Sequence, residues 1–347
     1  MQLSMAAIVG RLLGRLLALL ACLLAIAPRS VAAFDLKGRT VTLYVGGGPG
    51  GGVDIFARTL APYLGRYLPG EPAVVVSNMP GNGGMQAVQY AYSIAARDGT
   101  ALGTTNSGPV VEPLLNTTIQ LNYEMPKFQF VGSLLKGDMT CAVWHGSRIK
   151  TLADAREREV TMSSTGATSS PLRAALLVNT LIGTRFKPIS GFHVGTALLA
   201  LERGEVDGIC NTLSSLRTSR PDWLREGKFV PLVQVSLTGD AEIPHVPRVA
   251  DFVTREDDRQ LLEFSGLPYE FDNPYYLPPG APADALAAYR AAFDAATRDP
   301  AYRRDATQRG QNIQPRNGAD VTGLVARLYA TPKAVIQRMI AATTPRN

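Results

Sequence analysis

Cysteine, histidine and charged residues are all scarce in this chain of 347 residues. Three cysteines and three histidines are too few for a cysteine-rich scaffold or a series of zinc sites. His145, His193 and His245 match no metal-binding spacing, so we expect no metal. Charged residues make up 18% of the chain and hydrophobic residues 46%, which excludes a disordered protein and supplies a substantial core.

One long apolar run stands near the N-terminus. Residues 16–27 are all apolar, with two arginines in front of them and the small residues Val31-Ala32-Ala33 behind. The run is too short to span a bilayer, which takes about 20 residues, and the residues that follow suit a signal peptidase. We interpret residues 1–33 as a secretory signal peptide. Two alternatives stay open: an uncleaved anchor helix, and a lipoprotein signal that uses Cys22.

Much of the positive charge belongs to this leader. The formal net charge of the chain is +6, and residues 1–33 contain three arginines and no acidic residue. The remainder therefore carries only about half of that charge and has little electrostatic attraction for nucleic acid. We expect no nucleic-acid partner.

The two cysteines that remain after the leader are Cys141 and Cys210. Each lies in a short apolar run, at 140–144 and 206–210, that predicts a buried strand. Export would place both thiols in an oxidising compartment, which favours a structural disulfide between them. The alternative is a pair of buried free thiols.

Strands, loops and helices alternate along most of the chain. Apolar and β-branched runs predict strands at 40–45, 73–76, 101–105, 159–163, 186–189, 206–210 and 229–235. Helical spacing follows several of them and dominates the last third, with Asp54 and Asp320 at positions typical of N-caps. This alternation predicts parallel βαβ units and an α/β fold.

A glycine-rich loop connects the first predicted strand to the first helix. Gly46–Gly52 satisfies the G-x-G-x-x-G pattern of dinucleotide sites, but the next strand ends in Ser77-Asn78 instead of an acid that would hold a ribose. We therefore expect no cofactor. Such a loop at a helix N-terminus can instead bind an anion through backbone N–H groups, and 164–170 has the same layout. The alternative for each loop is a tight turn with a capped helix.

Five motifs in order resemble one known family. They are Gly48–Asp54, Asn78–Gly84, Asp98-Gly99-Thr100, Ser164-Thr165-Gly166 and Gly204–Gly208. Together they are similar to the motifs of the Bug-type extracytoplasmic solute receptors, the binding proteins of tripartite tricarboxylate transporters. The resemblance implies a two-lobed, type II-like periplasmic binding protein with a ligand between α/β lobes. Lobe 1 would comprise 34–136 and 231–347, and lobe 2 would comprise 137–230.

The same resemblance implies a set of ligand-binding residues that hold the carboxylate mainly through backbone N–H groups and ordered water, without an arginine clamp. They are Gly48, Pro49, Gly50, Gly51, Gly52, Val53, Asp54, Asn106, Ser164, Thr165, Gly166, Ala167, Thr168, Ser169, Phe192 and Asp207. Asp207 has an alternative role in ordering the loops between the lobes. Phe192 stands where the family has Tyr, and Gly52 and Val53 stand where many members have Ser and Thr. These departures indicate a more apolar or monocarboxylate solute.

The expected function is binding without chemistry. A periplasmic receptor, monomeric and not an enzyme, would close around a small carboxylate by hinge rotation and deliver it to the membrane permease of a tripartite tricarboxylate transporter. Two alternatives are an exported enzyme on the same fold, for which no acid/base set is visible, and a solute-sensing accessory of a receptor kinase.

Overall fold

The computed structural model describes residues 34–116, 121–137, 139–164, 169–192, 194–236, 238–240 and 242–344. The signal peptide expected at 1–33 lies outside these residues. The same holds for four expected ligand residues, Thr165, Gly166, Ala167 and Thr168, and for His193. Among the described residues, no helix combines the length and the apolar character needed to cross a membrane.

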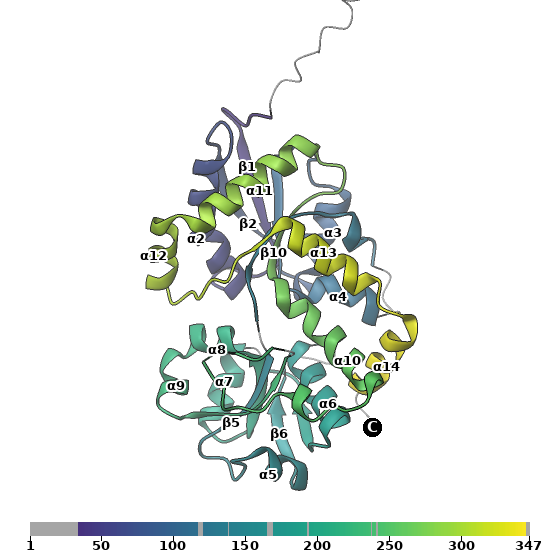
Figure 1. The fold of residues 1–347 in the computed structure, drawn as a ribbon. Coiled ribbons are helices and arrows are strands. Elements are labelled where there is room, and N and C mark those ends of the chain that lie inside the picture. The colour runs from purple at the N-terminus through teal and green to yellow at the C-terminus, as the bar shows by residue number, and fades with distance from the viewer. Residues whose placement is uncertain are drawn as a thin grey trace, which may run out of the picture. The chain divides into compact units, whose positions relative to one another are not determined.

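A six-stranded sheet forms the first half of the architecture, in the order β11-β4-β10-β3-β1-β2. Figure 1 labels β1, β2 and β10 of this sheet. Its strands are Thr40–Val45 (β1), Ala73–Asn78 (β2), Ala101–Thr104 (β3), Gln129–Leu135 (β4), Asp272–Leu277 (β10) and Arg316–Asn317 (β11). β1 pairs in parallel with β2 and β3, as the βαβ pattern predicts. β10 and β11 return from the last third of the chain and pair antiparallel.

A five-stranded sheet forms the second half, in the order β7-β6-β8-β5-β9. Its strands are Met139–Trp144 (β5), Val160–Ser163 (β6), Phe186–Ile189 (β7), Gly208–Thr212 (β8) and Phe229–Val235 (β9). β6 is parallel to β7 and β8, whereas β5 is antiparallel to β8 and β9. The strand expected at 206–210 begins two residues later. The lobe boundary expected at 230/231 falls inside β9.

Helices flank both sheets. They are Gly52–Tyr67 (α2), Met85–Ser93 (α3), Gly108–Leu115 (α4), Leu152–Glu157 (α5), Ser170–Ile182 (α6), Val194–Glu202 (α7), Leu213–Ser219 (α8), Pro221–Arg225 (α9), Glu256–Gly266 (α10), Ala283–Arg298 (α11), Pro300–Gln308 (α12), Gly318–Tyr329 (α13) and Lys333–Thr343 (α14). The prediction that Asp320 caps a helix is wrong. Asn317 is the N-cap of α13, and its Oδ1 accepts the backbone N–H of Asp320 at 2.9 Å. The cap lies three residues earlier because a short side chain reaches the third N–H of the helix from that position.

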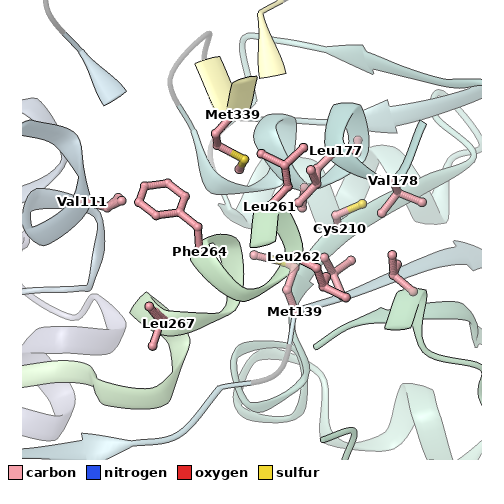
Figure 2. Close-up of a cluster of buried hydrophobic side chains, with 14 of the residues drawn as sticks. Val111, Met139, Leu177, Val178, Cys210, Leu261, Leu262, Phe264, Leu267 and Met339 are labelled. Carbon is pink, nitrogen blue, oxygen red and sulfur yellow. The ribbon is translucent and has the colours of Figure 1, made fainter. Parts of the chain in front are cut away.

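One buried apolar cluster extends over segments of both sheets. Figure 2 shows Leu261, Leu262 and Phe264 of α10 among side chains from α4, α6, α14 and the second sheet. α14 packs against α6, α10 and α4. The last helix, α14, therefore packs against α6, which flanks the second sheet. At this contact the Thr180 hydroxyl of α6 donates to the Ala342 carbonyl of α14 at 3.3 Å.

The second sheet contains the disulfide that the sequence favours. Cys141 of β5 and Cys210 of β8 are directly opposite in the antiparallel register and are joined by an S–S bond. Both residues are fully buried. The two cysteines are 69 positions apart in the sequence, and the chain segment between them includes β6, α6 and β7.

A polar turn fixes the entry to β3. The Asp98 carboxylate accepts the Thr100 hydroxyl at 2.6 Å and the Thr100 backbone N–H at 3.0 Å, and Arg39 pairs with it. The Tyr289 hydroxyl donates to the Gly99 carbonyl at 2.7 Å. The Thr100 hydroxyl bond, against an opposing effect of burial and with help from Arg39, lowers the pKa of Asp98 to about 2.

This turn makes stability depend on pH in the acid range. An unfolded Asp has a pKa of about 3.9, so the stabilisation from Asp98 is complete above about pH 4 and is lost as the pH falls toward about 2. We expect Asp98→Asn to flatten the pH dependence of the unfolding free energy in that window, measured by urea denaturation at several pH values. Asp284→Asn, at an exposed position, is the control. An unchanged slope in Asp98→Asn would contradict this assignment.

Candidate functional site

A cavity of about 550 Å³ lies between loops of the first-sheet half and the start of α6 in the second. Its described lining residues are Asn82, Gly83, Met85, Gln89, Asn106, Gly108, Pro109, Glu112, Leu121, Ser169, Ser170, Pro171 and Arg173. The chain positions that meet here are the loops after β2, β3 and β6. These are carboxyl ends of parallel strands, where α/β sheets generally bind ligands.

Three helices begin at the wall of this cavity. Met85 is the first residue of α3, Gly108 of α4 and Ser170 of α6. The N-caps of α3 and α4 make no side-chain capping bond, whereas the Ser169 hydroxyl accepts the Leu172 N–H at 3.5 Å. Helix N-termini carry a partial positive charge. Some of their N–H groups are already paired here, since Asn106 accepts the Gly108 N–H and Asp272 accepts the Ser107 N–H. The cavity wall is therefore suited to an anion.

Two of the expected ligand residues line this cavity. Asn106 joins two of the loops, because its Oδ1 accepts the Gly108 N–H at 2.8 Å and its Nδ2 donates to the Gly83 carbonyl at 3.2 Å. Ser169 lines it as the N-cap of α6. Thr165–Thr168, between β6 and Ser169, are outside the described residues.

Ser164 and Phe192 lie at the ends of neighbouring strands, β6 and β7. The Ser164 N–H donates to the Ile189 carbonyl at 2.9 Å, and the Phe192 N–H donates to the Ser164 carbonyl at 3.2 Å. The Phe192 ring packs against the apolar cluster that contains Leu198 and Leu201 of α7. These contacts join the backbone directly after β6 to the backbone after β7.

The glycine-rich loop is adjacent to the cavity but does not line it. Gly48, Pro49 and Gly50 form a turn, Gly51 is the N-cap of α2, and Gly52, Val53 and Asp54 form its first turn. A Cβ atom at Gly46 would lie 2.8 Å from the Thr105 hydroxyl and 3.1 Å from Gly84. The loops after β1, β2 and β3 thus approach so closely that glycine is needed at their contacts.

Asp54 is not the N-cap of α2, which corrects the sequence prediction. It is the third helical residue, and its carboxylate accepts the Gly50 N–H at 2.8 Å, Asn78 Nδ2 at 2.8 Å and Arg58 Nε at 3.0 Å. Burial raises the pKa of Asp54, but these three hydrogen bonds outweigh it and hold the pKa below its usual value. Because Asn78 also donates to the Gly47 carbonyl at 2.9 Å, the group anchors the loop to the end of β2.

Asp207 lies apart from the cavity. Its carboxylate accepts the Ser147 hydroxyl at 2.8 Å, the Thr161 hydroxyl at 2.8 Å and the Thr161 N–H at 3.0 Å. It lines a separate hollow with Trp144 and Arg148. The bonds attach the segment after β5 to the middle of β6, so the geometry favours a structural role.

Sequence reasoning missed an ion pair in the cavity wall. Arg173 of α6 contacts Glu112 of α4 at 2.9 Å, with side-chain exposures of 14% and 7%. The other Glu112 oxygen accepts Asn116 Nδ2 at 3.1 Å. The available signal was a single acid within the apolar run from Val110 to Leu115, which is unusual unless the charge is paired.

The two sheets, their βαβ units and the cavity at their loops define a two-lobed periplasmic binding-protein fold. Residues 57–340 match the family described as the tripartite tricarboxylate transporter family receptor, and the chain belongs to this family. The family expected from the sequence motifs is confirmed. A UPF0065 protein of Bordetella bronchiseptica is 28% identical over 284 residues, which cover 80% of this chain and 79% of that protein.

Solved structures share the fold. MatC from Rhodopseudomonas palustris with bound malate is 23% identical, over 88% of this chain and 99% of that one, with a TM-score of 0.63. Another R. palustris protein, solved with adipate, is 19% identical, over 89% and 98% of the two chains, with a TM-score of 0.67. At this level of identity the likeness shows the fold alone.

Proposed function

We propose that this receptor captures a small organic carboxylate in the cavity and delivers it to the membrane permease subunits of a tripartite transporter. The observation that carries the proposal is the convergence of three helix N-termini on one cavity. Each can stabilise a nearby anion by about 0.3–1 kcal/mol, and by up to about 2 kcal/mol when partly buried. Family membership and the malate and adipate held by the similar structures support the same class of solute.

The expected ligand loops belong to this proposal. We propose that Ser169 contacts the solute from the start of α6 and that 48–54 approaches the cavity through the Gly46–Gly84 contact. Ser164, Thr165, Gly166, Ala167 and Thr168 remain members of the proposed ligand set. Export to the periplasm behind a cleaved leader, a monomeric state and the absence of catalysis are parts of the same proposal.

We place the hinge where two chain connections run side by side. The Gly137 N–H, just before β5, donates to the Tyr269 carbonyl, just before β10, at 2.7 Å. Lys136 and Arg316 both pair with Glu270 beside it. The Gln234 N–H donates to the Pro247 carbonyl at 2.9 Å, which keeps the segment after β9 on the second sheet. The proposed lobes are then 34–136 with 270–347, and 137–269. A solute that contacts both lobes only when they are close shifts the population toward the closed form.

The test combines native mass spectrometry of gently purified mature protein with calorimetric titration of a carboxylate panel. Gln89→Trp should fill the cavity and weaken binding at least about tenfold, a loss of about 1.4 kcal/mol. Gln86→Trp is the matched control, because Gln86 is exposed on the same helix and does not line the cavity. A protein that is empty when purified and binds no member of the panel would refute carboxylate capture.

A further inference from the structure

The cavity wall carries two opposite charges that compensate each other. Glu112 and Arg173 are the charged members of its described lining. The side chains of the described lining therefore contribute no net charge, although an arginine is present.

This compensation changes what Arg173 can do. A free guanidinium would hold a carboxylate by paired hydrogen bonds, but one Arg173 nitrogen already bonds to Glu112 at 2.9 Å. An approaching anion also meets the Glu112 carboxylate beside it. The positive potential that remains comes from three helix N-termini, each equivalent to roughly half an elementary charge. Part of the charge of α4 is already offset, because the Asp272 carboxylate accepts the N–H of its N-cap Ser107 at 2.9 Å. The remaining potential is enough for one carboxylate, while a second would lose its hydration without a matching partner.

The other lining residues are suited to contact the uncharged part of the solute, beyond its carboxylate. Apolar surface comes from Met85, Pro109, Leu121 and Pro171, and uncharged polar groups come from Asn82 and Gln89. Such a wall can contact a hydrocarbon chain and accept or donate single hydrogen bonds.

We infer that the Glu112–Arg173 ion pair makes the cavity selective for monocarboxylates over dicarboxylates, with Glu112 as the specificity-determining residue. The inference rests on the proposed function. Removing the Glu112 charge frees the Arg173 guanidinium for a second carboxylate. Glu112→Gln retains the shape and a hydrogen-bonding oxygen, so the change in selectivity comes from the charge.

The experiment measures dissociation constants by calorimetry for straight-chain acids of four, five and six carbons, each as a monocarboxylate and a dicarboxylate. The wild-type protein should prefer the monocarboxylate of each pair. Glu112→Gln should shift the ratio of the two constants at least about tenfold toward the dicarboxylate. The double variant Glu112→Gln/Arg173→Gln restores a neutral wall and should return the ratio toward that of the wild type.

The ratio of the two dissociation constants distinguishes an effect on selectivity from an effect on lobe closure. The ion pair connects α4 with α6, so its loss also changes how readily the lobes close, but closure alters both affinities by the same factor. Glu159→Gln, which removes an exposed carboxylate paired with Lys187, is the control and should leave the ratio unchanged.

A wild-type preference for dicarboxylates, or an unchanged ratio in Glu112→Gln, would overturn the inference while the proposed function stands. Equal changes in both affinities would overturn it as well and assign the pair to closure. If the wild type binds none of these acids and none of the wider panel, the proposed function fails together with the inference.

Discussion

Loss of the Cys141–Cys210 disulfide is expected to lower the free energy of unfolding by about 4 kcal/mol. The two cysteines are 69 positions apart, and in the chain-entropy description a cross-link of this span restricts the unfolded ensemble by about that amount. The segment it closes holds half of the second sheet and all of α6. The reduced protein should therefore unfold at a clearly lower denaturant concentration.

The measurement is guanidinium denaturation with and without a reductant. Replacing both cysteines by alanine gives the control, because its unfolding should not respond to reductant. The double variant itself should be less stable than the reduced wild type, since both positions are fully buried and lose packing. A difference below about 1 kcal/mol between oxidised and reduced wild type would contradict the expected effect of the cross-link.

Gly84→Ala should cost about 3 kcal/mol or more of stability. Gly84 has a φ of +101°, and a Cβ there would lie 2.4 Å from the Thr105 hydroxyl and 2.8 Å from the Gly46 carbonyl oxygen. Backbone strain of this kind costs roughly 1–3 kcal/mol, and overpacking in a fixed environment adds about 1–3 kcal/mol. The displaced loop lies beside Gly83 and Met85 of the cavity wall, so ligand affinity should fall too.

Gly83→Ala provides a matched control at the neighbouring position. Gly83 also has a positive φ, of +66°, but a Cβ there meets nothing within 4 Å. Gly83→Ala should therefore lower the free energy of unfolding by only about 1 kcal/mol, the cost of placing alanine in a left-handed backbone conformation. Urea denaturation of the two variants measures the difference, and equal losses would show that the close contact at Gly84 relaxes at no cost.

The local parts of the fold were accessible from the sequence, because they repeat a short pattern. β1, β6 and β7 follow the expected β-branched runs closely. β10 was missed because it contains Pro274 and begins with Asp272-Asn273, a composition that argues against a central strand. It nevertheless lies between β3 and β4, with a register shift at Tyr275/Tyr276 and a positive φ at Asn273. Such pairing across more than 100 residues leaves no local signal.

The candidate site also contains features that the sequence predicts and features that it does not. The glycine-rich loop and the helix that follows the loop 164–170 were predictable, since helix starts follow local residue preferences. The Glu112–Arg173 pair joins residues 61 positions apart and depends on how α4 meets α6. The role of Asp54 was predicted wrongly from the sequence around it, because its carboxylate binds Asn78 at the end of another strand instead of capping its own helix.

The anchoring of the glycine-rich loop has a consequence for the order of events in solute capture. Asp54, Asn78 and the Gly46–Gly84 contact all lie within the first-sheet half, so none of them depends on the second. That half of the receptor is preassembled before any solute arrives. In the mechanism proposed above, the solute docks there first and the second half follows. Its residence time is then governed by how often the receptor reopens, because a docked solute leaves only from the open form.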